Sequence, residues 1–175
     1  MKPKPSKKRI LILGQPKSGK VSLVKALTSS FPDDLHENST SHAGLTHSIT
    51  LTTRYYSYDV GIWIDEIPLE DSSKWLNEYL SEEATPVLQS LAAIIFTIDS
   101  ATGKQEEILD IAKSLNERGE EVEWDGTCVI VEKKSSSTQV STNMPVLCEE
   151  HMWEYIDLNQ TGKNEFGGIQ LQFML

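Results

Sequence analysis

The pattern of apolar and polar positions divides the chain into short strands separated by helices. Three near-continuous apolar runs are typical of strands buried on both faces of a sheet: residues 9–13, 91–98 and 127–131. Apolar residues alternate with polar ones at 49–53 and again at 56–64, which predicts two half-buried strands. Arg54-Tyr55 connects them as a hairpin, and a last strand is expected at 153–158.

Helical spacing of apolar residues fills most of the intervals between these strands. The predicted helices cover residues 21–30, 71–80, 104–118 and 145–151, with a short helical turn at 87–91 after the interruption by Pro86. Asp71 or Ser72 is expected to cap the second helix, and Gly119 to stop the third. Residues 31–45 and 132–143 are predicted to be loops.

This order of elements predicts an α/β fold with a mostly parallel sheet, one antiparallel hairpin strand and helices on both faces. It is the arrangement of the small-GTPase version of the P-loop NTPase fold. Residues 1–8 are expected to form a disordered basic tail, and residues 9–175 a single G-protein-like domain.

Charge and composition exclude several classes of protein. The chain has 175 residues, with 16 Lys+Arg against 26 Asp+Glu, and a formal net charge of −10. Five of the cations lie in the first nine residues, so the rest of the chain carries −15, which argues against direct nucleic-acid binding. No apolar run is long enough for membrane insertion. Cys128 and Cys148 do not make a disulfide framework, so a cytoplasmic location is expected.

The candidate chemistry is a phosphate-loop motif between the first strand and the first helix. Gly14-Gln15-Pro16-Lys17-Ser18-Gly19-Lys20 matches G-x-x-x-x-G-K in the required context. Gly14, Gly19 and Lys20 are therefore candidate phosphate-binding residues. The next position should offer a hydroxyl to Mg²⁺, but it is Val21, and Ser22 is the nearest replacement although one helical step rotates it by about 100°.

The other parts of a GTPase site are incomplete. The positions where a guanine-reading Asn-Lys-x-Asp is expected read Glu132-Lys133-Lys134-Ser135, and Asp65-Glu66-Ile67-Pro68 lacks the glycine of Asp-x-x-Gly. Asp99 follows a buried strand, as many polar residues do, and the pair Glu106-Glu107 is interpreted as a solvated helix face. The chain is therefore expected to be no enzyme, to hold no metal and to bind GTP or ATP weakly at most.

Several segments resemble the alpha- and gamma-adaptin-binding protein family, whose fungal members are named increased recombination centers proteins. These segments are Ala43-Gly44-Leu45-Thr46-His47, Thr53-Arg54-Tyr55-Tyr56-Ser57-Tyr58-Asp59-Val60, Ile62-Trp63-Ile64-Asp65-Glu66-Ile67, the strand at 92–100 and Trp153-Glu154-Tyr155-Ile156-Asp157-Leu158. The resemblance covers roughly residues 9–168. Relative to the family, the C-terminal helix is expected to be truncated near Gly167-Gly168-Ile169.

The resemblance implies a non-catalytic G-domain-like cofactor that binds large subunits of clathrin adaptor complexes and assists their assembly or function in vesicle-mediated transport. Two alternatives stay open: a genome-maintenance factor that acts indirectly, and a nucleotide-binding switch with residual P-loop activity. Tyr55, Leu45 and Trp63 are candidate partner-binding residues, because the loop and hairpin after the first helix form the effector face of a G-protein framework. Tyr56 shares its strand face with the apolar set and is assigned to the core.

Overall fold

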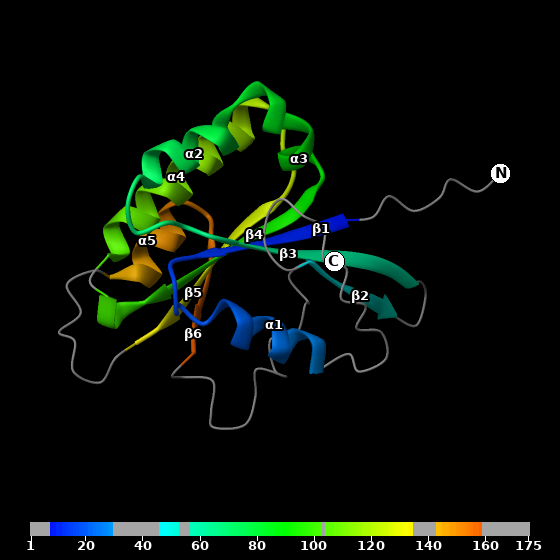
Figure 1. Ribbon diagram of the computed structural model, residues 1–175, viewed down its shortest axis with the longest axis horizontal. Coiled ribbons are helices and arrows are strands. Elements are labelled where there is room, and N and C mark those ends of the chain that lie inside the picture. The colour runs from blue at the N-terminus through cyan, green and yellow to red at the C-terminus, as the bar shows by residue number, and fades with distance from the viewer. Residues whose placement is uncertain (1–7, 30–45, 53–56, 103, 135–142, 159–175) are drawn as a thin grey trace.

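The computed structural model describes residues 8–29, 46–52, 57–102, 104–134 and 143–158, and these residues form an α/β fold (Figure 1). Its strands join one sheet in the order β2-β3-β1-β4-β5-β6. Their bounds are β1 Lys8–Gly14, β2 Thr46–Thr52, β3 Ser57–Glu66, β4 Leu91–Asp99, β5 Thr127–Lys133 and β6 Glu154–Asp157. Strands β3, β1, β4, β5 and β6 run parallel, and β2 pairs antiparallel with β3. The predicted mostly parallel sheet with one antiparallel strand is thus confirmed.

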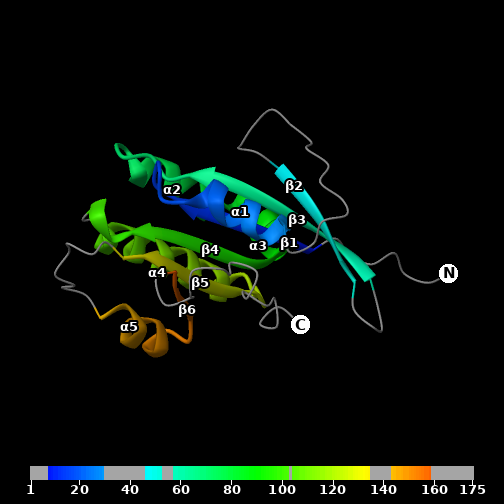
Figure 2. The same ribbon diagram turned by 90° about the horizontal axis from the view of Figure 1, so that it is seen from below.

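Helices cover both faces of the sheet, as the sequence predicted. Figures 1 and 2 show α1 (Lys20–Ser29) on one face and the other four helices on the opposite face. These four are α2 Ser72–Leu80, α3 Thr85–Gln89, α4 Gln105–Glu121 and α5 Met144–Glu150, with short 3-10 turns at Glu82–Ala84 (η1) and Ser100–Thr102 (η2). Among the described segments, no helix has the length and apolar character needed to cross a bilayer.

Successive side chains of β1 pack into two separate hydrophobic clusters, one on each face of the sheet. Leu11 and Leu13 join the cluster beneath α4 and α5, whereas Ile10 and Ile12 join the cluster beneath α1. Because successive side chains of a strand point to opposite faces, one strand supplies both layers. The same rule holds in β3, where Ile62 lies on the α1 side and Trp63 packs partly against the other cluster.

Several element boundaries differ from the predictions. Strand β1 begins at Lys8, one residue inside the predicted tail. Helix α3 contains Pro86 in its first turn, where its missing N–H costs nothing, so the predicted turn at 87–91 was placed too late. Strand β5 continues through Lys133, and Glu132, which was assigned to a loop, is fully buried.

Gly119 does not end its helix, contrary to the prediction. Helix α4 continues to Glu121, and a Cβ atom built at Gly119 would lie 2.7 Å from Cε3 of Trp124. The indole Nε1 of Trp124 donates to the Leu91 carbonyl at 2.7 Å, which fixes the ring against α4. This glycine therefore provides space for an aromatic ring rather than a left-handed helix end.

Both cysteine thiols are expected to be unreactive in the folded protein. Cys128 and Cys148 are free and buried, and burial raises the pKa of Cys128 to about 12 and that of Cys148 to about 11. Both side chains are therefore protonated at pH 8. Since the thiolate is the nucleophile, the protonated thiols should react slowly. Iodoacetamide should leave the native chain unmodified at this pH and alkylate both residues in denaturant, as intact-mass spectrometry would record. Rapid native alkylation would contradict this burial.

Candidate functional site: the motif loop

The motif loop, defined as residues 14–20, leaves the carboxyl end of β1 and enters α1. Strand β1 lies between β3 and β4, and the chain passes to one side of β1 first and to the other side later. In open α/β sheets, ligands bind outside the carboxyl ends of the strands at such a switch point. The fold therefore places the motif loop at the position where this type of sheet offers a binding crevice.

Contacts with β4 hold the motif loop in place. The hydroxyls of Ser18 and Thr97 lie 2.6 Å apart, and the Thr97 hydroxyl also donates to the Leu13 carbonyl at 3.3 Å. A Cβ atom at Gly14 would lie 2.1 Å from Oγ1 of Thr97 and 2.4 Å from Oγ of Ser18, so only glycine fits there. Gly19 has φ +95°, a backbone conformation that glycine adopts without strain. The structure therefore requires glycine at position 14 because of space and favours it at position 19 because of backbone conformation.

Lys20 is almost completely buried, and its ammonium is held by the protein itself. Its Nζ donates to the carbonyls of Gly14 at 2.8 Å and Gln15 at 2.6 Å, and it lies 3.3 Å from Oε2 of Glu66. A lysine ammonium has three N–H donors, so these three partners use all of them. Burial lowers the pKa of Lys20, and Glu66 acts in the opposite direction.

The register of β1 and β3 brings Glu66 to the motif loop. Gly14 and Glu66 are directly paired in the parallel ladder, and the Ile67 N–H donates to the Gly14 carbonyl at 3.0 Å. The Glu66 side chain is 57% exposed, whereas that of Lys20 is 7% exposed. One member of the ion pair is therefore fixed in the protein, and the other reaches it from the solvent side.

The two residues that follow Lys20 do not supply a buried hydroxyl. Val21 is 51% exposed at the position where a metal-holding hydroxyl was expected. Ser22, the candidate replacement, is exposed on α1. The structure thus brings Gly14, Gly19 and Lys20 together in one loop and leaves Ser22 on the helix surface.

Asp65, the first residue of the segment where Asp-x-x-Gly was expected, is bound to α2. Its Oδ2 accepts bonds from Nε1 of Trp75 at 3.1 Å and from the hydroxyl of Tyr79, and its Oδ1 accepts from the Glu66 N–H at 2.8 Å. Burial, together with the bond to Asp65, raises the pKa of Tyr79 above its usual value. The phenol therefore stays neutral and continues to donate to the carboxylate across the physiological pH range.

Glu107 links the motif loop to two helices. Its carboxylate accepts from the Ser72 hydroxyl at 2.7 Å and from Nε2 of Gln15 at 3.4 Å, and it pairs with Lys104 at 3.8 Å. The prediction that Glu107 is only a solvated residue was therefore wrong. Asp71 occupies the N-cap position of α2, as predicted, but its side chain makes no capping bond, and the Ser72 hydroxyl donates to Glu107 instead.

The carboxyl ends of β5 and β6 carry polar side chains that pair with one another. Glu132 accepts from Nε2 of Gln105 at 3.3 Å and from the Tyr155 hydroxyl at 2.7 Å. Lys134 pairs with Asp157 at 2.9 Å. These are the strand ends where a guanine-reading motif was looked for, and their carboxylates and ammonium are engaged within the protein.

Of the candidate partner-binding residues, the structure describes Trp63. Trp63 is half-buried, and the Arg9 guanidinium lies 4.4 Å from its ring centroid in a cation–π contact. Leu45, Tyr55 and Tyr56 lie outside the described residues, so their predicted roles stay predictions.

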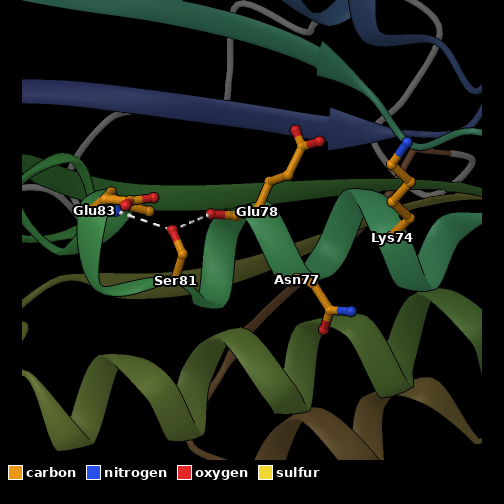
Figure 3. Close-up of a pocket in the computed structure, with 6 residues that line it drawn as sticks. Lys74, Asn77, Glu78, Ser81 and Glu83 are labelled. Atoms are coloured by element: carbon orange, nitrogen blue, oxygen red, sulfur yellow. Dashed lines mark hydrogen bonds between the residues drawn. The ribbon is translucent and has the colours of Figure 1, made fainter.

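An open hollow of about 570 Å³ lies along α2 and η1, and Figure 3 shows its lining. Lys74, Asn77 and Glu78 come from α2, and Ser81, Glu83 and Ala84 from the turn that follows. The Ser81 hydroxyl donates to the Glu78 carbonyl at 2.8 Å and accepts from the Ala84 N–H at 3.3 Å. The Ser81 hydroxyl therefore stabilises the turn from α2 into η1.

Sequence reasoning missed Asp65, Glu66 and Glu107 as parts of this site. The available signal was the pair of consecutive acids at the end of the hairpin strand. Their partners lie on α1 and α2, too far away along the chain for the periodicity of a single strand or helix to reveal the pairing.

Comparison with known proteins finds relatives in fungi. The chain is 32% identical to a Candida tropicalis protein named Increased recombination centers protein 6, over 90% of this chain and 65% of the relative. A Meyerozyma guilliermondii protein of the same name is 30% identical over 90% of the chain and 61% of the relative. An uncharacterized protein of Schizosaccharomyces pombe is 40% identical over 52% of the chain and 37% of the relative.

The chain spans less than two thirds of the length of each of these three relatives. No family model matches it. The Candida tropicalis and Meyerozyma guilliermondii proteins support the resemblance to the fungal increased recombination centers proteins. This chain is similar to both over 90% of its length.

Proposed function

We propose that this chain is a G-domain-like binding module without nucleotide hydrolysis, which binds large subunits of clathrin adaptor complexes and assists their assembly or function in vesicle-mediated transport. The observation that carries the non-catalytic part is that the Lys20 ammonium donates to the carbonyls of Gly14 and Gln15 and is neutralised by the Glu66 carboxylate. A motif loop held in this way keeps its shape without a bound phosphate.

The small-GTPase-like class is part of this proposal. Its support is the position of the motif loop after β1, next to a parallel sheet extended by one antiparallel strand, β2. Phosphoryl transfer in that class needs a placed metal ion and a placed water. Val21 replaces the metal-holding hydroxyl, and Asp65 is bound to Trp75 and Tyr79 of α2, so the residues present favour binding over catalysis.

The partner class rests on the sequence resemblance to the adaptin-binding family alone, since the names of the fungal relatives mention only increased recombination centers. The acidic body of the chain suits a protein partner with a basic or apolar surface, acting in the cytoplasm.

The name of the relatives also favours a second candidate, a genome-maintenance factor. The charge of −15 beyond the first nine residues makes direct contact with DNA unfavourable, so this role would be indirect. A nucleotide-binding switch has less support, because the three donors of Lys20 are already engaged.

Binding to adaptor subunits is the direct test. The immobilised chain should capture purified alpha- or gamma-type adaptin, and Tyr55→Ala should weaken the capture while Tyr55→Phe, which keeps the ring, retains most of it. Surface plasmon resonance with both subunits would measure this. No saturable binding of either subunit by the wild-type chain would contradict the proposal.

A further inference from the structure

We propose that the end of α5 is a docking surface for a protein partner that offers an apolar pocket bordered by Lys or Arg. The docking turn, defined as residues 149–154, carries the exposed side chain of Met152 among the carboxylates of Glu149, Glu150 and Glu154. Figure 2 shows α5 at the margin of the helical layer. The inference deepens the proposed function and rests on it for the probe, a purified adaptor subunit.

Met152 occupies the backbone position just after the C-cap of α5, where helices commonly place glycine. Its φ is +56°, in the left-handed region. The Met152 N–H donates to the Glu149 carbonyl at 3.1 Å, and the Trp153 N–H donates to the Cys148 carbonyl at 2.8 Å, which closes the helix end. The Met152 side chain is 90% exposed, so burial does not compensate for this conformation. Glycine at position 152 would therefore make the isolated chain more stable.

The charges of the docking turn are also unfavourable for a helix end. Carbonyl groups at a helix C-terminus favour cations, but the last turn of α5 has no basic residue and contains Glu149 and Glu150. Glu154 adds a third carboxylate at the start of β6. All three are exposed, and none forms an ion pair with a described residue. A partner that brings cations to this turn would therefore stabilise it.

Contacts on the inner side of the docking turn fix its backbone. The Trp153 side chain is buried and stacks on the His151 ring, with the centroids 4.6 Å apart. Its Nε1 donates to Oδ1 of Asn116 at 3.4 Å. Because the turn is already ordered, a partner would bind the Met152 side chain without the entropy cost of ordering this backbone.

The two unfavourable features occur at one turn, which favours a binding role over a purely structural one. A methionine side chain adapts its shape to an apolar pocket. The three carboxylates around Met152 require cations at the border of that pocket. They would repel the phosphates of a nucleic acid or of a lipid headgroup, so the chemistry of the turn fits a basic protein surface.

Capture of purified gamma-type adaptin by the immobilised chain, followed by surface plasmon resonance, tests the inference. Met152→Gly and Glu150→Lys should each weaken capture at least about tenfold. Met152→Gly relieves the backbone strain, so its melting temperature should rise by about 2–4 °C. Glu150→Lys places a cation at the helix end, so its melting temperature should not fall. Weaker capture by an equally or more stable chain excludes unfolding as the cause.

Three further variants serve as controls. Met152→Leu keeps a large apolar side chain in the same conformation, so it should retain most of the capture. Leu69→Ala removes an apolar side chain that is 52% exposed before α2, and Glu83→Lys reverses an exposed carboxylate of η1. Both lie outside the docking turn and should bind adaptin as the wild type does.

Peroxide footprinting gives a second measurement, on the wild-type chain. Hydrogen peroxide transfers one oxygen atom to the sulfur of Met152, which becomes a sulfoxide, and is itself reduced to water. Bound adaptin should slow this reaction at least about threefold by covering the side chain. Met144 is 1% exposed, so it should stay unoxidised in the folded chain with or without adaptin.

Several results would overturn the inference. Unchanged capture by both Met152→Gly and Glu150→Lys would do so and would leave adaptor binding standing. An equal loss of capture in Leu69→Ala or Glu83→Lys would show that the effect is not confined to the docking turn. Lower melting temperatures of Met152→Gly and Glu150→Lys would show that the turn has a structural role. No saturable capture by the wild-type chain would contradict the proposed function as well, which separates the two failures.

Discussion

Gly14→Ala is expected to lower the free energy of unfolding by about 3 kcal/mol, since it combines overpacking with the loss of a buried hydrogen bond. The new methyl group would lie 2.1 Å from Oγ1 of Thr97 and 3.0 Å from the Thr97 carbonyl oxygen. Thr97 is buried in β4 and bonded to both Ser18 and Leu13, so it cannot move aside without breaking these contacts.

For a chain of this length, the loss should lower the melting temperature by roughly 6–12 °C. Gly61→Ala is the matched control: a methyl group there would meet only Cγ of Arg9 at 3.6 Å, an ordinary contact, and Gly61 also lies in a strand. Thermal denaturation followed by circular dichroism would compare the two variants. Equal melting temperatures would show that the loop tolerates a side chain at Gly14.

Asp65→Ala should cost about 2 kcal/mol of unfolding free energy and loosen α2 from the sheet, because two side-chain donors lose a charged acceptor. Trp75 and Tyr79 both donate to this carboxylate, and the apolar residues of α2 that pack against the core are only partly buried. Hydrogen exchange followed by mass spectrometry should show faster exchange in residues 72–80, with smaller changes elsewhere.

Asp110→Ala provides the control for Asp65→Ala. Asp110 is exposed on α4, and its backbone carbonyl rather than its carboxylate accepts the bond from Ser114. Alanine also favours a helix more than aspartate does, so stability should stay the same or rise slightly. Unchanged exchange in residues 72–80 of Asp65→Ala would mean that packing alone holds α2.

The contacts of Asp65 and Glu66 stabilise the positions of α2 and of the motif loop, although the residues of a GTPase site are incomplete. Two consecutive acids at the end of β3 point in different directions, one to α2 and the other to the motif loop. Asp65 accepts from two side chains of α2, and Glu66 pairs with the ammonium of Lys20. The site is thus a set of interactions within the chain, and ligand binding there would require an exchange of partners.

The sequence alone determined the order of strands and helices, the place of the motif loop and the opposite faces of Ile62 and Trp63. These features are local, because a period of two or of 3.6 residues decides both the type of an element and its buried face. The glycine-lysine motif is likewise contained in seven consecutive residues.

The tertiary structure alone decided which side chains meet. Register pairs Glu66 with Gly14 in the ladder, and a slip of one residue would have brought Asp65 to that position and reversed the faces of β3. Gly119 was expected to stop a helix, but the ring of Trp124 requires its small size. Glu132 was expected in a loop, but Tyr155 and Gln105 compensate for its burial. In each case the decisive contact joins elements whose relative position depends on packing, which no local pattern encodes.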